Sequence, residues 1–408
     1  RIPPVIRFGL NYSIAASIVL SGAVWLLLRF GIAHGEKLQP IGALSGWVVI
    51  GVPVLAVQLV LFQTILGLQS VKLRIVLEKI LQPLLRFALP FGLVLWAGDR
   101  LHAAVGGMVI GAAVLALIAA HFVTKRLRLM PASTSATGDV RQEWMRYSLP
   151  FVLYSLQNFV SVGMGLDVFL VAFLASVRES GIYAAAFRFT PVLVLARGAI
   201  DYAFGPKAGL LYGQSDLNAI RTLYKTSSTL ALAWTLPFAI VLTMFSQPLM
   251  STFFGPGYDA GAAALAILVF GFVVDGATGC NTTLLSMVGR SGLVLMNGLA
   301  GGVATVCLCL LLVPSLGITG AAVAVTVARS LVNVMATTEI WRLQHMHPFS
   351  GATAKIMAAA ISAALLGLLC WWQLGFDDAS IALSLPIALV AASYFALLRM
   401  TRVSWRMA

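Results

Sequence analysis

Charged residues are scarce in this sequence. Only 14 of its 408 residues are Asp or Glu and 27 are Lys or Arg, so that 10% of the chain is charged. Soluble globular domains carry about 25% charged residues. Apolar residues make up 60% of the chain, and its mean hydropathy is +0.95. This balance excludes an ordinary soluble domain and predicts an all-α polytopic membrane protein.

Cysteine is also rare, and motifs of enzymatic sites are missing. The four cysteines fall inside apolar stretches, where they act as small packing residues: Cys280, Cys307, Cys309 and Cys370. We therefore expect neither a disulfide nor a metal site. No loop carries a Gly-rich phosphate-binding motif with its Lys, and no His/Cys cluster has the spacing of a zinc site. The sequence thus favours a protein that is not an enzyme and that has no cofactor.

Long apolar runs dominate the chain instead. About 20 apolar residues are enough for a helix to cross a bilayer. By that measure the sequence predicts twelve spans, at 8–33, 42–68, 80–97, 103–123, 148–177, 181–211, 229–250, 261–288, 292–313, 318–341, 354–374 and 381–398. Two amphipathic stretches, 140–147 and 215–225, are typical of short helices that lie in the membrane interface.

The basic residues are distributed unevenly between the two sides of these spans. Of the 27, 20 fall on one side, while 4 fall on the other (Arg29, Lys37, Arg100, Arg178) and 3 lie within spans (Arg188, Arg197, Arg329). An excess of Lys and Arg marks cytoplasmic loops. We therefore expect both termini in the cytoplasm and interpret the net charge of +13 as a topology signal, with no nucleic acid as a partner.

Polar linkers divide the spans into three groups. Residues 1–135 hold four spans, 136–345 hold six, and 346–408 hold a final pair. Many transporters consist of two similar bundles. We therefore interpret 1–135 as a partial N-terminal lobe, 136–345 as the C-terminal six-helix lobe, and expect two further spans upstream of Arg1.

Five ionisable residues lie at membrane depth, where a charge is costly unless it is paired or faces water. Arg188, Arg197 and Arg329 would make a cationic cavity suited to phosphate, because a guanidinium offers a planar fork of donors; they are our candidate substrate-binding residues. Asp167 and Asp275 are candidates for ion coupling. The structural alternative pairs Asp167 with Arg188, whose predicted depths match, and pairs Asp275 with Arg329 or Arg197.

Three stretches resemble a known family: DVFLVAFLASVRESGIYAAAFRF (167–189), FFGPGYDAGAAALAILVFG (253–271) and NGLAGGVATVCLCLLLVPSLGITGAAVAVTVARS (297–330). They are similar to the polysaccharide transporter branch of the multidrug/oligosaccharidyl-lipid/polysaccharide (MOP) exporter superfamily, which includes the O-antigen flippases. The resemblance implies a two-lobe fold of fourteen helices, of which the first span here would be the third.

The resemblance also implies a function. It indicates a flippase of the bacterial inner (cytoplasmic) membrane that moves an undecaprenyl-pyrophosphate-linked oligosaccharide by alternating access, for polysaccharide or lipopolysaccharide O-antigen synthesis. The implied partners are the lipid-linked oligosaccharide, the lipid bilayer, H⁺ or Na⁺ as coupling ion, and polysaccharide polymerases. Two alternatives are a drug/cation antiporter of the multidrug and toxin extrusion (MATE) type and a lipid II flippase. A membrane-embedded glycosyltransferase is less favoured, because no acidic catalytic loop is evident.

Overall fold

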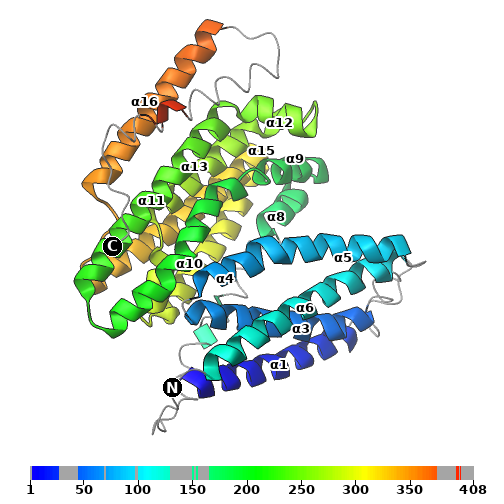
Figure 1. The fold of residues 1–408 in the computed structure, drawn as a ribbon. Coiled ribbons are helices and arrows are strands. Elements are labelled where there is room, and N and C mark those ends of the chain that lie inside the picture. The colour runs from blue at the N-terminus through cyan, green and yellow to red at the C-terminus, as the bar shows by residue number, and fades with distance from the viewer. Residues whose placement is uncertain are drawn as a thin grey trace. The chain divides into compact units, whose positions relative to one another are not determined.

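The computed structural model describes residues 2–26, 45–68, 70–96, 100–128, 149–150, 153–154, 165–374, 392–394 and 396. Over these residues every regular element is a helix, as the apolar composition predicts (Figure 1). The chain divides into two compact units, Arg1–Trp144 and Met145–Ala408. The predicted domain boundary after residue 135 lies outside the described residues, and the three-part division stays a prediction.

The first unit is a bundle of apolar helices. They are α1 (Ile2–Leu26), α3 (Ser45–Gly67), α4 (Val71–Ile75), a π-helical turn (Val76–Leu81), α5 (Gln82–Trp96) and α6 (Arg100–Arg128). Within this unit α3 packs against α1 and α6, and α5 packs against α6. Phe62, Ile65 and Leu115 are almost fully buried at the centre. The helices of the bundle thus overlap the first four predicted spans.

The second unit contains the longer series of helices. They are α8 (Leu166–Leu174), α9 (Val177–Phe187), α10 (Pro191–Gly213), α11 (Leu217–Met244), α12 (Ser246–Phe254), a 3₁₀ turn (Asp259–Gly261), α13 (Ala262–Thr278), α14 (Asn281–Met287), α15 (Ser291–Gln344) and α16 (Gly351–Leu374). Helix α13 is central, since it packs against α9, α10, α11, α12 and α15. Residues of α13 therefore have neighbours on several sides.

The 54-residue α15 is two helices that fold back on each other. Gly317 interrupts it with non-helical angles of φ 58° and ψ −136°, a region that glycine adopts without steric cost. Two contacts show that the halves run antiparallel. The Nδ2 atom of Asn297 lies 2.7 Å from Oε2 of Glu339, and a methyl group added at Gly301 would meet Val332. The halves correspond to the predicted spans 292–313 and 318–341.

Seven described helices are long and apolar enough to cross a membrane, or eight if the bent pair of α9 and α10 counts as one span. The chain is thus a polytopic membrane protein, whereas the predicted count of twelve is not reached within the described residues. The predicted span 381–398 falls largely outside them and 148–177 falls partly outside them, while the interfacial stretch 140–147 lies wholly outside them. The identity of the membrane and the side on which the termini lie stay predictions.

The second predicted interfacial helix, 215–225, is wrong. Asp216 caps a helix here, since its Oδ1 accepts a hydrogen bond from the N–H of Ala219 at 3.0 Å, but that helix continues as α11 to Met244. Ile220 and Tyr224 are 1% and 0% exposed and pack in a core with residues of α10 and α14. The apolar face therefore contacts protein and not the membrane surface.

Candidate functional site

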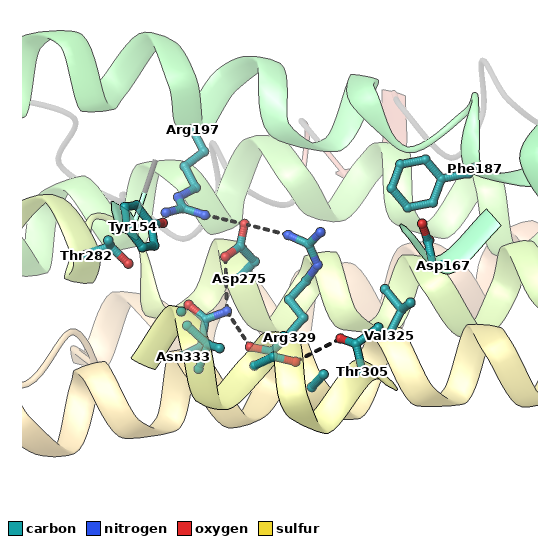
Figure 2. A pocket seen from close by; sticks show the side chains of 15 residues that line it. Tyr154, Asp167, Phe187, Arg197, Asp275, Thr282, Thr305, Val325, Arg329 and Asn333 are labelled. Carbon is teal, nitrogen blue, oxygen red and sulfur yellow. Dashed lines mark hydrogen bonds and ion pairs between the residues drawn. The ribbon is translucent and has the colours of Figure 1, made fainter. Parts of the chain in front are cut away.

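A cavity of about 260 Å³ lies within the second unit (Figure 2). Polar and charged side chains line it beside the small residues of α15: Tyr154, Asp167, Arg197, Asp275, Thr282, Thr305, Arg329 and Asn333. Apart from Tyr154, these side chains come from α8, α10, α13, α14 and both halves of α15. The sequence therefore brings four of its five predicted site residues to a single cavity.

Asp275 is the centre of the charged cluster. Its Oδ2 atom accepts a hydrogen bond from Nη1 of Arg197 and lies 3.9 Å from Nη1 of Arg329. Figure 2 shows the two guanidinium groups approaching this carboxylate from two sides. The side chain of Asp275 is 7% exposed, and those of Arg197 and Arg329 are 17% and 23% exposed. One largely buried carboxylate thus serves two arginines.

The two arginines are held differently. The Nε atom of Arg197 lies 3.6 Å from Oδ2 of Asp201, one turn further along α10, so Arg197 lies between two carboxylates. The guanidinium of Arg329 lies over the ring of Phe272, 4.1 Å from its centroid, a cation–π contact. The buried Nε of each arginine has no hydrogen-bond partner among the described residues. Because Arg329 lies 3.9 Å from Asp275 while Arg197 is hydrogen-bonded to it, Arg329 is the less closely paired cation.

A chain of amide hydrogen bonds fixes the other oxygen of Asp275. Helix α13 ends at Thr278, Gly279 follows with a φ of +65°, and α14 begins at Asn281. The N–H of Thr282 donates to Oδ1 of Asn281 at 2.7 Å, Nδ2 of Asn281 donates to Oδ1 of Asn333 at 3.0 Å, and Nδ2 of Asn333 donates to Oδ1 of Asp275 at 3.0 Å. Since a backbone N–H can only donate, it sets the orientation of both amides.

Asp167 lies apart from this cluster. Its Oδ2 accepts a hydrogen bond from the hydroxyl of Tyr183 at 2.8 Å, and both residues are buried. The expected pair with Arg188 is wrong: Arg188 follows the end of α9, is exposed, and does not line the cavity. The predicted depths of the two residues match, but the side chain of Asp167 points toward the hydroxyl of Tyr183 and not toward Arg188.

Some residues of the site are absent from the sequence-based candidates. Asn333 and Asn281 orient Asp275, Phe272 contacts Arg329, and Tyr183 binds Asp167. One signal was available for Asn333, since it lies four residues after Arg329 and so on the same helix face. The contacts of Asn281, Phe272 and Tyr183 depend on how separate helices pack, which the spacing of residues does not reveal.

Comparisons with known proteins relate this chain to transporters by fold. A comparison with protein-family models and one with curated proteins found no match. Solved structures do match. A mutant of the MATE transporter VcmN from Vibrio cholerae has a TM-score of 0.71 at 15% identity, over 85% of this chain and 79% of that chain. A MOP superfamily transporter from Pyrococcus furiosus has a TM-score of 0.70 at 15% identity, over 83% and 77%.

The lipid II flippase MurJ, in an inward closed conformation, matches 97% of this chain and 82% of its own, with a TM-score of 0.63 at 13% identity. The chain therefore has the fold of MOP superfamily membrane transporters. These neighbours are transporters and not enzymes. Since MATE and MurJ proteins both match, and at low identity, the fold does not identify the substrate or the polysaccharide branch.

Proposed function

We propose that this protein is an inner-membrane flippase that moves an undecaprenyl-pyrophosphate-linked oligosaccharide outward by alternating access. The observation that carries the proposal is the convergence of Arg197 and Arg329 on one cavity wall, where they share Asp275. Two guanidinium groups that face one space are a donor set suited to phosphate oxygens. The fold and the resemblance of residues 167–189 support transport by alternating access.

The size of the cavity limits which part of the substrate it takes. Pockets for drug-sized molecules occupy about 300–1,000 Å³, and this cavity measures about 260 Å³. It accommodates the charged diphosphate region and leaves the oligosaccharide and the polyprenyl chain outside. Arg329 would bind first, because its contact with Asp275 is long, at 3.9 Å.

A flipping assay tests this proposal directly. The full chain is reconstituted into liposomes with a polyprenyl-pyrophosphate-linked glycan, and glycan that reaches the opposite leaflet is measured by its accessibility to an added glycosidase. We expect flipping by the unmodified chain and a loss of at least tenfold with Arg329→Ala. Arg342→Ala is the matched control, since Arg342 is exposed near the end of the same helix. No movement of the glycan, with or without an ion gradient, would refute the proposal.

A cation antiporter of the MATE type is the second candidate, and Asp167 favours it. This carboxylate lines the cavity and its hydrogen-bond partner is the neutral phenol of Tyr183, so it is available to an incoming cation. Efflux of a cationic dye from liposomes distinguishes the two candidates. An antiporter would export the dye and lose this activity with Asp167→Asn, whereas a flippase would move the glycan and not the dye.

A further inference from the structure

The charges of the cluster around Asp275 balance before any substrate enters. Arg197 and Arg329 carry two positive charges, and Asp275 and Asp201 carry two negative charges within contact of them. An anion that binds both guanidinium groups therefore has to displace Asp275. That carboxylate is 7% exposed, and a buried carboxylate that has lost its cations is strongly unfavourable.

Protonation of Asp275 would remove this unfavourable buried charge. A carboxylate that loses nearby cations and gains a nearby anion binds a proton more readily, because both changes disfavour its charged form. Asp201 stays 3.6 Å from Nε of Arg197 and half-buried, and the hydroxyl of Thr283 donates to its other oxygen at 2.9 Å. Its environment changes less, and so the proton goes to Asp275.

The hydrogen bonds select the oxygen that takes the proton. Oδ1 of Asp275 accepts from Nδ2 of Asn333, whose own oxygen accepts from Asn281. The carbonyl of Arg329 also accepts from Nδ2 of Asn333, at 3.1 Å, which again fixes the amide so that its nitrogen faces Asp275. Only Oδ2 faces the arginines, so the proton resides there and donates to an oxygen of the bound anion.

We propose that the cavity binds its anion together with one proton, which Asp275 takes from solvent on its Oδ2 atom as Arg197 and Arg329 turn to the anion. The proposal rests on the proposed function, since it assumes an anionic group at these arginines. It assigns to Asp275 the coupling of substrate charge to a proton, and to Asn333 the positioning of that carboxylate. The bond formed is O–H, and no electrons are transferred.

Other groups that face Asp275 are few in the described part of the chain. From the elements packed around α13 they are Arg197 and Asp201 on α10, Arg329 on α15, Cys280 before α14, Tyr154, and Asp167 across the cavity. Helix α11 contributes two further side chains. Thr235 lies beside Gly276, and the hydroxyl of Tyr224 donates to the carbonyl of Thr278. Asp167 is the other carboxylate of the cavity lining that competes for the proton.

Calorimetry with sulfate tests the proposal. Sulfate has the shape and charge of a phosphate dianion and does not itself take up protons near neutral pH. The purified full chain in detergent is titrated with sodium sulfate in two buffers of equal pH and different ionisation enthalpy, which yields the protons taken up per sulfate. We expect about one proton, and an affinity that falls about tenfold per pH unit at high pH.

Two variants locate the proton. With Asp275→Asn we expect sulfate binding without proton uptake and without pH dependence, whereas Asp259→Asn, at an exposed position outside the cavity lining, should keep the uptake of the unmodified chain. Binding without a proton, or uptake that persists in Asp275→Asn, overturns the inference and leaves the anion site intact. Absence of sulfate binding removes the anion site itself and the proposed function with it. If Asp275→Asn does not fold, the proton count of the unmodified chain decides the question.

Discussion

Nδ2 of Asn333 lies 3.0 Å from Oδ1 of Asp275, and the carbonyl oxygen of the same amide accepts hydrogen bonds from Asn281 and Thr278. Asn333 thus joins the carboxylate at the cavity to the break between α13 and α14. Each of these groups is buried, and a buried polar group without its partner is costly.

Replacing Asn333 by Leu should therefore destabilise the protein strongly. The change keeps the number of side-chain heavy atoms but leaves Oδ1 of Asp275 without its donor and removes one acceptor each from Thr278 and Asn281, for an expected loss of about 2–4 kcal/mol. Thermal unfolding of the full chain in detergent measures it. Asn218→Leu, at an exposed position of α11, should cost less than about 0.5 kcal/mol. Equal effects of the two variants would show that the amide network adds nothing to stability.

The two arginines should contribute unequally to stability. Arg197→Ala removes the close partner of Asp275 and leaves it with Arg329 at 3.9 Å, so we expect a loss of about 3 kcal/mol. Arg329→Ala leaves the Asp275–Arg197 pair in place and should cost about 1 kcal/mol, chiefly its contact with Phe272. Unfolding in detergent is again the measurement, with Arg342→Ala as control. The reverse order of the two losses would contradict the geometry.

The sequence predicted several features of this fold because membrane-spanning helices leave strong signals. Apolar runs marked the two halves of α15, and the short gap between them contains the turn at Gly317. Charges at membrane depth are so few that Asp275 could be expected to meet Arg197 or Arg329, and the structure brings all three together. Because polar groups are scarce in the predicted spans, the sequence alone indicated the charged residues of the site.

Other features required the packing of the helices. Counting residues gives depth along a helix axis but not the direction in which a side chain points, and so Asp167 was assigned to Arg188 although it binds Tyr183. Similarly, an amphipathic face suits a membrane surface and a protein core equally well, which explains why Ile220 and Tyr224 were placed at the interface. Both errors concern direction around a helix.

The hairpin of α15 allows a test by compensating substitution. A methyl group at Gly301 would lie 2.4 Å from Cγ2 of Val332, while the next nearest atom, the carbonyl oxygen of Ala328, is 3.8 Å away. Gly301→Ala should therefore destabilise the protein by about 1–3 kcal/mol. Val332→Ala removes the clashing atom, so the double variant should be more stable than the sum of the single losses, with a coupling of about 1–2 kcal/mol. Additive losses would place Val332 away from Gly301.

The break after α13 depends on a glycine for two reasons. Gly279 has a φ of +65°, and a methyl group there would lie 2.2 Å from Oγ and 2.7 Å from Cα of Ser228. Because backbone is involved, Ser228→Ala cannot relieve the overlap, and Gly279→Ala should cost more than about 3 kcal/mol with or without it. Gly181→Ala, on a helix with open space around it, should instead stabilise by up to about 1 kcal/mol. Yields of folded protein and unfolding temperatures in detergent separate these cases, and rescue of Gly279→Ala by Ser228→Ala would show that the backbones are further apart than 2.7 Å implies.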